Sequence, residues 1–319
     1  MTQVSKLRVV EINNASGAYL GNTPENRGTL VRSSSALVGH PRELDDYHLC
    51  GLYSKAGVPH HIVPITLEDP LPPATVPYVR QSQLISQAVC SGLKKQEAVL
   101  VIGGTCVSAP GTAGGMRLAF GEDAKLGIIW LDAHGDMNIP ETSPSGMLGG
   151  MPFATIMGLC LEDWRHSCGL IPPIAPSEAI LSDARSFDPP EAENLAKIDL
   201  QVIKTKEFAN TTFWQQQVQQ LADRVDALYL HIDADIVDAQ YLPSVNTPEP
   251  DGPDIWLLME NIQSVMATGK VALVNVASVF FDRESARKEK HRGTETAILS
   301  GIRMIGTILE NWQQQTTPS

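Results

Sequence analysis

Short apolar, β-branched runs that alternate with helix-like stretches are the feature that most restricts the fold of this chain. Strands as apolar as these, separated by helices, form a parallel sheet that helices cover on both faces. We therefore predict a three-layer α/β/α fold with a central, mostly parallel eight-stranded sheet. The predicted strands are residues 6–12, 60–65, 98–104, 126–134, 179–184, 200–205, 227–235 and 271–277. The predicted helices are roughly residues 81–95, 111–120, 153–163, 213–225, 255–267 and 294–312.

Composition limits the number of domains, the partners and the compartment. The chain has 319 residues, 43% of them hydrophobic, so we expect one domain over residues 1–319 with a frayed tail at 313–319. The net charge of -12 argues against nucleic acid or an acidic membrane as a partner. No apolar run approaches the ~20 residues that a membrane span needs. Five cysteines without a repeated spacing favour a cytoplasmic location over a disulfide framework.

Two of the predicted strands end in carboxylates, at the edge of the sheet where ligands bind in such folds. WLDAHGD contains Asp132, His134 and Asp136, and HIDADIVD contains Asp233 and Asp235. Residues two apart in a strand share a face, so the members of each set can point the same way. Buried carboxylates in this number need a cation, and they suit two divalent ions ~3.5–4 Å apart. Oxygen-rich ligation with a little imidazole favours Mn²⁺ over Zn²⁺; the alternative is a solvated turn at each strand end.

Three motifs, in this order along the chain, resemble the metal motifs of the arginase/agmatinase (ureohydrolase) family. They are GGTCVS at 103–108, DAHGD at 132–136 and DADIVDA at 233–239, where the family has G-G-x-H-S, D-A-H-x-D and D-x-D-x-x-D-P. Residues 1–95 match the family poorly. Further similar segments are TSPSG at 142–146, RSFDPPE at 185–191 and NTPEPDGP at 246–253.

The resemblance implies the α/β/α fold of that family, often assembled as homo-trimers or hexamers, and two Mn²⁺ ions that activate a bridging hydroxide. The implied ligands are Cys106, Asp132, Asp136 and Asp233 for the first ion and Asp132, His134, Asp233 and Asp235 for the second. Asp238 would be a structural acid behind these ligands. His231 shares the strand alternation of Asp233, so it is either a hydrogen-bonding neighbour of the metals or a satisfied core histidine.

For the substrate, the resemblance implies contacts from the loop after DAHGD. Asn138, Thr142 and Ser145 would contact an α-carboxylate, and Asp188 would contact an α-amino group. The segment DRESARKEKHR at 282–292 is either a solvated loop or a lid whose arginines, Arg283 or Arg287, bind an anionic substrate.

The sequence departs from the family at positions that matter for arginine. Asn275 stands where the family has a glutamate that pairs with the guanidinium group, and losing such a buried pair costs ~3–5 kcal/mol. Gly149 replaces a loop histidine thought to shuttle protons, and Met147 replaces an asparagine of the same loop. Plain L-arginine in the family's pose is therefore not the expected substrate.

Cys106 occupies the position of a histidine ligand, and four interpretations stay open. It is a thiolate ligand that shifts the first site from Mn²⁺ toward Zn²⁺, Fe²⁺ or Ni²⁺, or it binds weakly and leaves one firmly held ion. It is otherwise a catalytic nucleophile whose pKa a nearby dication lowers, or an inert buried thiol.

The expected function is metal-dependent hydrolysis of a C–N bond in a small-molecule substrate: a modified guanidine, an amidine or a related amide. A metal-bound hydroxide would attack, and Asp136 would accept a hydrogen bond from it and pass on a proton. Two alternatives remain. The same fold and metals could carry out a biosynthetic cyclisation or condensation, or the chain could be a non-catalytic subunit.

Overall fold

A computed structural model describes residues 4–13, 17–34, 42–243, 245, 247–279 and 292–312. The tail at 313–319 and residues 282–291 of the basic segment, with Arg283 and Arg287, lie outside the described residues. Within the described residues, no helix is both long enough and apolar enough to cross a membrane.

All eight predicted strands are present, and they lie in one parallel sheet, which confirms the predicted fold class. They are β1 (Leu7–Ile12), β4 (His60–Ile65), β5 (Ala98–Ile102), β6 (Leu126–Leu131), β7 (Ala179–Ser182), β8 (Gln201–Ile203), β9 (Ala227–Asp233) and β10 (Val271–Ala277). The strand order is β4-β1-β5-β10-β9-β6-β7-β8, and every neighbouring pair is parallel. The strands β5, β10, β9 and β6 are therefore central, and their carboxyl ends meet at one edge.

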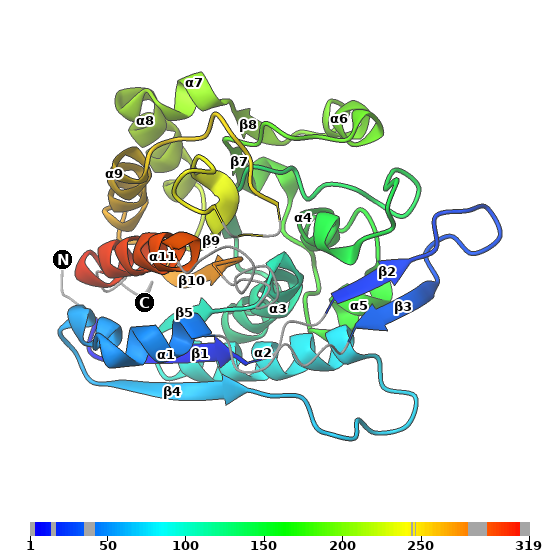
Figure 1. Ribbon diagram of the computed structural model, residues 1–319, viewed down its shortest axis with the longest axis horizontal. Coiled ribbons are helices and arrows are strands. Elements are labelled where there is room, and N and C mark those ends of the chain that lie inside the picture. Colours follow the sequence, from blue (N-terminus) through cyan, green and yellow to red (C-terminus); the bar gives the residue numbers. More distant parts are fainter. Residues whose placement is uncertain are drawn as a thin grey trace.

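Helices cover both faces of the sheet, as the apolar strands require. The helices are α1 (Arg42–Leu49), α2 (Pro77–Lys94), α3 (Ala109–Phe120), α4 (Pro152–Ile156), α5 (Glu162–Ser167), α6 (Pro189–Leu195), α7 (Thr205–Phe208), α8 (Thr211–Ala222), α9 (Ile255–Met266) and α11 (Arg292–Glu310). Alternate strand residues enter two separate cores: Val9 and Leu100 pack with α1, α8, α9 and α11, whereas Val10 and Val101 pack with α2, α3 and α4. Figure 1 shows the sheet running through the middle of the molecule between these helices.

One predicted helix is wrong. The stretch predicted at 153–163 is two short helices, α4 and α5, because the backbone leaves the right-handed region between them. Gly158 has φ +79° and Leu161 has φ +47°, and positive φ values end a right-handed helix. The break turns α5 toward α2, where Trp164 donates to Ser82.

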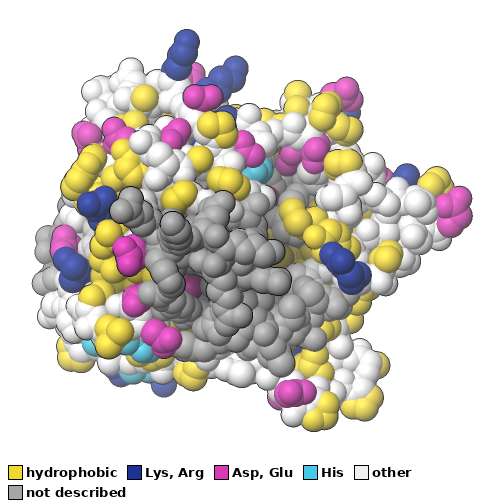
Figure 2. Space-filling view, viewed as in Figure 1, with side chains coloured by type: hydrophobic (Ala, Val, Ile, Leu, Met, Phe, Trp, Pro, Cys, Tyr) yellow, Lys and Arg dark blue, Asp and Glu magenta, His cyan; other side chains and the backbone are white. Residues whose placement is uncertain are grey.

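The N-terminal part contains a hairpin that the strand pattern did not predict. It consists of the antiparallel strands β2 (Gly17–Leu20) and β3 (Leu30–Ser34). It protrudes from the body at the right of Figures 1 and 2. An isolated bridge between Tyr19 and Met147 fastens the hairpin to the loop that follows β6. The hairpin thus lies beside the carboxyl edge of the sheet.

Candidate metal centre

A pocket of about 390 Å³ opens at the carboxyl edge of the central strands. All six predicted metal ligands line it: Cys106, Asp132, His134, Asp136, Asp233 and Asp235. They come from three places that are far apart in the sequence, directly after or at the end of β5, β6 and β9. The parallel sheet brings them together because its central strands end at one edge.

Four carboxylates in this pocket are almost completely buried. Asp132, Asp136, Asp233 and Asp235 are between 1% and 6% exposed. Burial raises the pKa of each, and the charge of Asp235 adds to the effect on Asp233, whose pKa rises to about 7. Asp136 Oδ2 and Asp235 Oδ1 have no hydrogen-bond partner among the described residues. Mutually repelling carboxylates with unpartnered oxygens fit one or more divalent cations.

His134 lies between two of these carboxylates. Its Nδ1 is 3.4 Å from Asp132 Oδ1 and 3.3 Å from Asp235 Oδ2. Burial opposes a charged imidazole, but hydrogen bonds to the two carboxylates outweigh burial and raise the pKa of His134 to about 12. A metal ion bound by Asp132, His134 and Asp235 would take the place of the proton; their ligand atoms lie within 4.8 Å of one another. The three residues fit a second-ion site.

Glu249 was missed as a functional residue. Its Oε1 is 3.2 Å from Nε2 of His134, the ring nitrogen that faces away from the carboxylates. Such a partner orients a ligand histidine and fixes its tautomer. Glu249 belongs to the segment NTPEPDGP, so its position in a family-like loop was the available signal.

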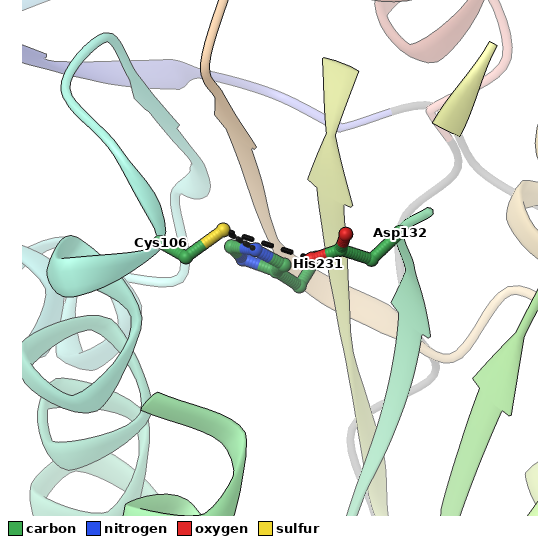
Figure 3. A group of neighbouring side chains, drawn as sticks. All are labelled: Cys106, Asp132 and His231. Carbon is green, nitrogen blue, oxygen red and sulfur yellow. Dashed lines mark hydrogen bonds between the residues drawn. The ribbon is translucent and has the colours of Figure 1, made fainter. Parts of the chain in front are cut away.

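Cys106 begins the turn after β5, and its thiol faces the cluster (Figure 3). Sγ is 2.8 Å from Asp233 Oδ2, 3.8 Å from Asp132 Oδ2 and 3.3 Å from His231 Nε2. Burial, followed by the charges of Asp233, Asp136 and Asp132, raises the pKa of the thiol well above its usual value. Without a cation the thiol is therefore protonated and donates to Asp233.

His231 is fully buried in β9 and reaches the same cluster. Its ring stacks on Trp130 with centroids 3.7 Å apart, and its Nδ1 is 3.1 Å from the Tyr229 hydroxyl. Burial lowers the pKa of His231 to about 3, so its imidazole is neutral. Trp130 also donates from Nε1 to Asp132 Oδ2 over 3.0 Å.

The predicted substrate residues fall into two groups. Asn138, Ser145 and Asp188 line the pocket, and Thr142 donates to Asn138 Oδ1 just behind the wall. Asn275 is separate from them. It is fully buried beside His231 in the sheet register, is not a lining residue, and donates to Ser108 Oγ.

Asp238 also lies away from the pocket lining. It accepts hydrogen bonds from the backbone amides of Gln240 and Asp251. Asp238 thus holds two loops together behind the ligands.

Part of the pocket wall comes from segments without a recognisable motif. Tyr19 of the hairpin, Phe187 and Val245 give the wall an apolar side, and Met147 adds to it. Gly149 lies on the wall as well, and a Cβ built there would meet no atom closer than 3.9 Å. No lysine or arginine lines the pocket among the described residues. The pocket therefore combines an acidic floor with a partly apolar wall.

Comparisons with known proteins show which sequences this chain is similar to. The family model "Arginase family" matches residues 42–295. Arginase of Bacillus caldovelox is 29% identical over 208 residues, which are 63% of this chain and 69% of that protein. Arginase of Bacillus subtilis is 31% identical over 173 residues, which are 54% of this chain and 57% of that protein. The aligned part of this chain thus spans between 57% and 69% of the length of these two relatives.

Solved structures are similar to this chain in fold over nearly its whole length. Arginase from Bacillus cereus has a TM-score of 0.75 at 19% identity, over 96% of this chain and 98% of that one. Formimidoylglutamase from Bacillus subtilis has a TM-score of 0.66 at 13% identity, over 99% of this chain and 89% of that one. Identities this low show the shared fold alone. The family model, however, covers most of the chain, and the protein belongs to the arginase family.

Proposed function

We propose that this protein is a metal-dependent hydrolase of a C–N bond in a modified guanidine, an amidine or a related amide. One observation carries the proposal: the six candidate ligands surround unpartnered, buried carboxylate oxygens at the floor of a pocket large enough for a small molecule. A purely structural cluster would leave no reason to bury four carboxylates together beside a cavity.

The candidate ligands would divide into two sets around two ions. Cys106, Asp132, Asp136 and Asp233 would hold the first ion, and Asp132, His134, Asp233 and Asp235 the second. Mn²⁺ suits the oxygen-rich second set, and Zn²⁺, Fe²⁺ or Ni²⁺ become competitive where the thiol is a ligand. Such ions, when bound, lower the pKa of a coordinated water and so supply the nucleophile.

Neighbouring hydroxyls hold the carboxylates in place. Thr247 donates to Asp235 Oδ2 over 2.8 Å, and Ser278 donates to Asp233 Oδ2 over 2.5 Å. Asp136 differs from both because no hydroxyl among the described residues donates to its carboxylate, whose Oδ2 has no partner there. Its backbone, with φ +49°, is held by two amides that donate to its carbonyl. Asp136 is therefore the carboxylate available to accept a proton during the reaction and to pass it to the leaving amine.

Three positions argue against arginine itself as the substrate. Asn275 carries no charge and gives its amide to Ser108, so it offers no carboxylate to a guanidinium group. Gly149 has no side chain to move a proton, and Met147 presents an apolar group to the wall. A substrate with a less basic reacting group and an amino group near Asp188 suits this pocket best.

A turnover screen tests the proposal. The substrates are arginine, agmatine, N-hydroxyarginine, guanidinobutyrate and formiminoglutamate, each supplied with Mn²⁺, Ni²⁺ or Zn²⁺ in turn. We expect turnover of N-hydroxyarginine or formiminoglutamate, whose reacting groups are less basic, to exceed turnover of arginine. Asp136→Asn should abolish this turnover, and the exposed control Asp199→Asn should retain it. Absence of product from every pairing would overturn the proposal, and arginine as the best substrate would overturn its specificity.

A further inference from the structure

Three residues on neighbouring strands lie level with one another beneath the candidate metal centre, and one of them, His231, has an imidazole that belongs to none of the three metal motifs. The parallel register places His231 of β9 level with Trp130 of β6 and Asn275 of β10. From there its Nε2 points at Cys106 Sγ over 3.3 Å, and Figure 3 shows the thiol, the ring and the Asp132 carboxylate directed at one another. An imidazole thus approaches the first ion's position from the sheet side.

We propose that His231 is a ligand of the first metal ion in place of Asp136, so that Cys106, His231, Asp132 and Asp233 form a thiolate–imidazole–carboxylate site. The inference rests on the proposed function in assuming that the pocket holds metal. It adds a ligand from β9 in compensation for the imidazole that is absent at position 106. The imidazole ligand would come from His231 on β9, and the Cys106 thiol would occupy the position where the family has a histidine.

The distances fit such a site. Ligand atoms at bond lengths of ~2.0–2.3 Å in a tetrahedron lie ~3.3–3.8 Å from one another. Cys106 Sγ lies 3.3 Å from His231 Nε2 and 3.8 Å from Asp132 Oδ2. One ligand atom from each of the three residues lies within 4.8 Å of the other two. Asp233 Oδ2 is closer to Sγ, at 2.8 Å, because the protonated thiol donates a hydrogen bond to it.

The imidazole is oriented as a metal ligand needs to be. The Tyr229 hydroxyl, 3.1 Å from Nδ1, can accept the proton of that nitrogen and so leave the Nε2 lone pair facing the thiol. Stacking on Trp130, with an interplanar angle of 21°, prevents the ring from turning. The Trp130 indole holds Asp132 through Nε1, so one side chain positions two ligands.

The same thiol and imidazole could instead act as a nucleophile and its base. Coulomb repulsion decides against that arrangement, because Asp132 and Asp233 face the sulfur and disfavour a free thiolate. A bound dication reverses the sign of the interaction and makes the thiolate favourable. The ligand role is therefore the one that this environment supports.

A soft first site makes the two sites unequal. Sulfur and nitrogen donors favour Zn²⁺, Fe²⁺ or Co²⁺ over Mn²⁺, whereas the second site has one imidazole and carboxylates. We expect the first site to take Zn²⁺ or Co²⁺ in preference to Mn²⁺ and the second site to discriminate less.

Cobalt binding to the full-length, metal-free protein tests the ligand set without any measurement of turnover. We expect one near-ultraviolet thiolate-to-cobalt band per chain on anaerobic titration with Co²⁺. Cys106→Ser should remove the band, and the control Cys168→Ser, at a buried thiol outside the pocket, should retain it. His231→Asn should retain the band and weaken Co²⁺ binding by more than about tenfold. His134→Asn should leave the band and the Co²⁺ affinity of the first site unchanged.

X-ray absorption of the zinc-loaded wild type guards against variants that fail to fold. It should show one sulfur at ~2.3 Å together with imidazole scattering at the first ion. Absence of sulfur, or a His231→Asn variant that binds Co²⁺ with the wild-type spectrum and affinity, would overturn the proposal. A protein that shows the band but turns over nothing would instead contradict the proposed hydrolase and leave the ligand set intact.

Discussion

Asn138 donates from Nδ2 to Asp188 Oδ2 over 3.0 Å, so the loop after β6 is joined to the N-cap residue of α6. Both side chains line the pocket, and Thr142 holds the amide of Asn138 from behind through Oδ1. No lysine or arginine competes for the Asp188 carboxylate among the described lining residues. This pair is the best candidate for binding an amino group of the substrate.

Asp188→Asn should therefore affect substrates according to their charge. The amide can keep the contact with Asn138, but it cannot make a charge-assisted bond to an ammonium group. We expect KM for an amine-bearing substrate to rise about tenfold, since hydrogen bonds to charged groups contribute ~1.5–3 kcal/mol, while KM for the same substrate without its amino group stays constant. The exposed Glu193→Gln on α6 is the matched control. Equal changes for both substrates would show that Asp188 does not recognise the amine.

Glu249→Gln should weaken the second metal ion. The carboxylate lies against Nε2 of His134 and holds the opposite nitrogen toward Asp132 and Asp235. Loss of such a partner typically lowers metal affinity by about 10–100-fold. Calorimetric titration of Mn²⁺ measures the effect, with the exposed Glu260→Gln on α9 as control. Wild-type affinity in Glu249→Gln would mean that His134 is held by its other contacts alone.

Gly149→His should be tolerated and should alter the pH dependence. The space around Gly149 is open to 3.9 Å, and its backbone is not in the left-handed region, so the melting temperature should remain close to the wild-type value. A titrating group near the leaving amine should raise kcat by up to ~10²-fold, at the low end of general acid–base effects. The profile of kcat against pH should gain a step near ~6.5, the ordinary pKa of histidine. Gly149→Gln fills similar space without titrating, and an identical profile for both variants would rule out proton transfer from this position.

Asp183→Asn should remove an acid-dependent part of the stability. Burial raises the pKa of Asp183 to about 6, against the opposing effect of Arg185. Between its unfolded value of 3.8 and about 6, the folded protein holds a proton that the unfolded chain has lost, so the free energy of unfolding falls as pH rises through this window.

Denaturant unfolding of the metal-free protein at several pH values measures this effect. From pH 4 to pH 7, the stability of Asp183→Asn relative to wild type should increase by up to ~3 kcal/mol. The exposed Asp199→Asn should show no such trend. A constant difference between Asp183→Asn and wild type would contradict the linkage.

The sheet and the set of candidate metal ligands were predictable because both depend on local patterns. Apolar runs such as residues 227–235 are long and uninterrupted, and parallel strands must end at a shared edge. The positions of His231 and Asn275 were not predictable in the same way. Their neighbours depend on the register between β9, β10 and β6, and a single strand's alternation does not contain that information.

The rest of the site escaped prediction because it depends on contacts between distant segments. Glu249 is one acid in a proline-rich loop, and only the folded chain brings it to His134. Tyr19 belongs to a strand of four residues in which intermediate and buried positions alternate, a signal too short to separate from a loop. Its place at the pocket follows from the β-bridge to Met147, which lies 128 residues further along the chain.

The bridge between Tyr19 and Met147 belongs to the wall of the pocket, which is built from different segments than the floor that carries the candidate metal ligands. The floor is built by strand ends that the core on both faces holds rigidly, whereas this part of the wall is a surface hairpin resting on a surface loop. Insertions or exchanges in such a hairpin leave the sheet and its ligands untouched. Lineages of this fold can therefore acquire new substrates by remodelling residues 17–34 while inheriting their metal chemistry unchanged.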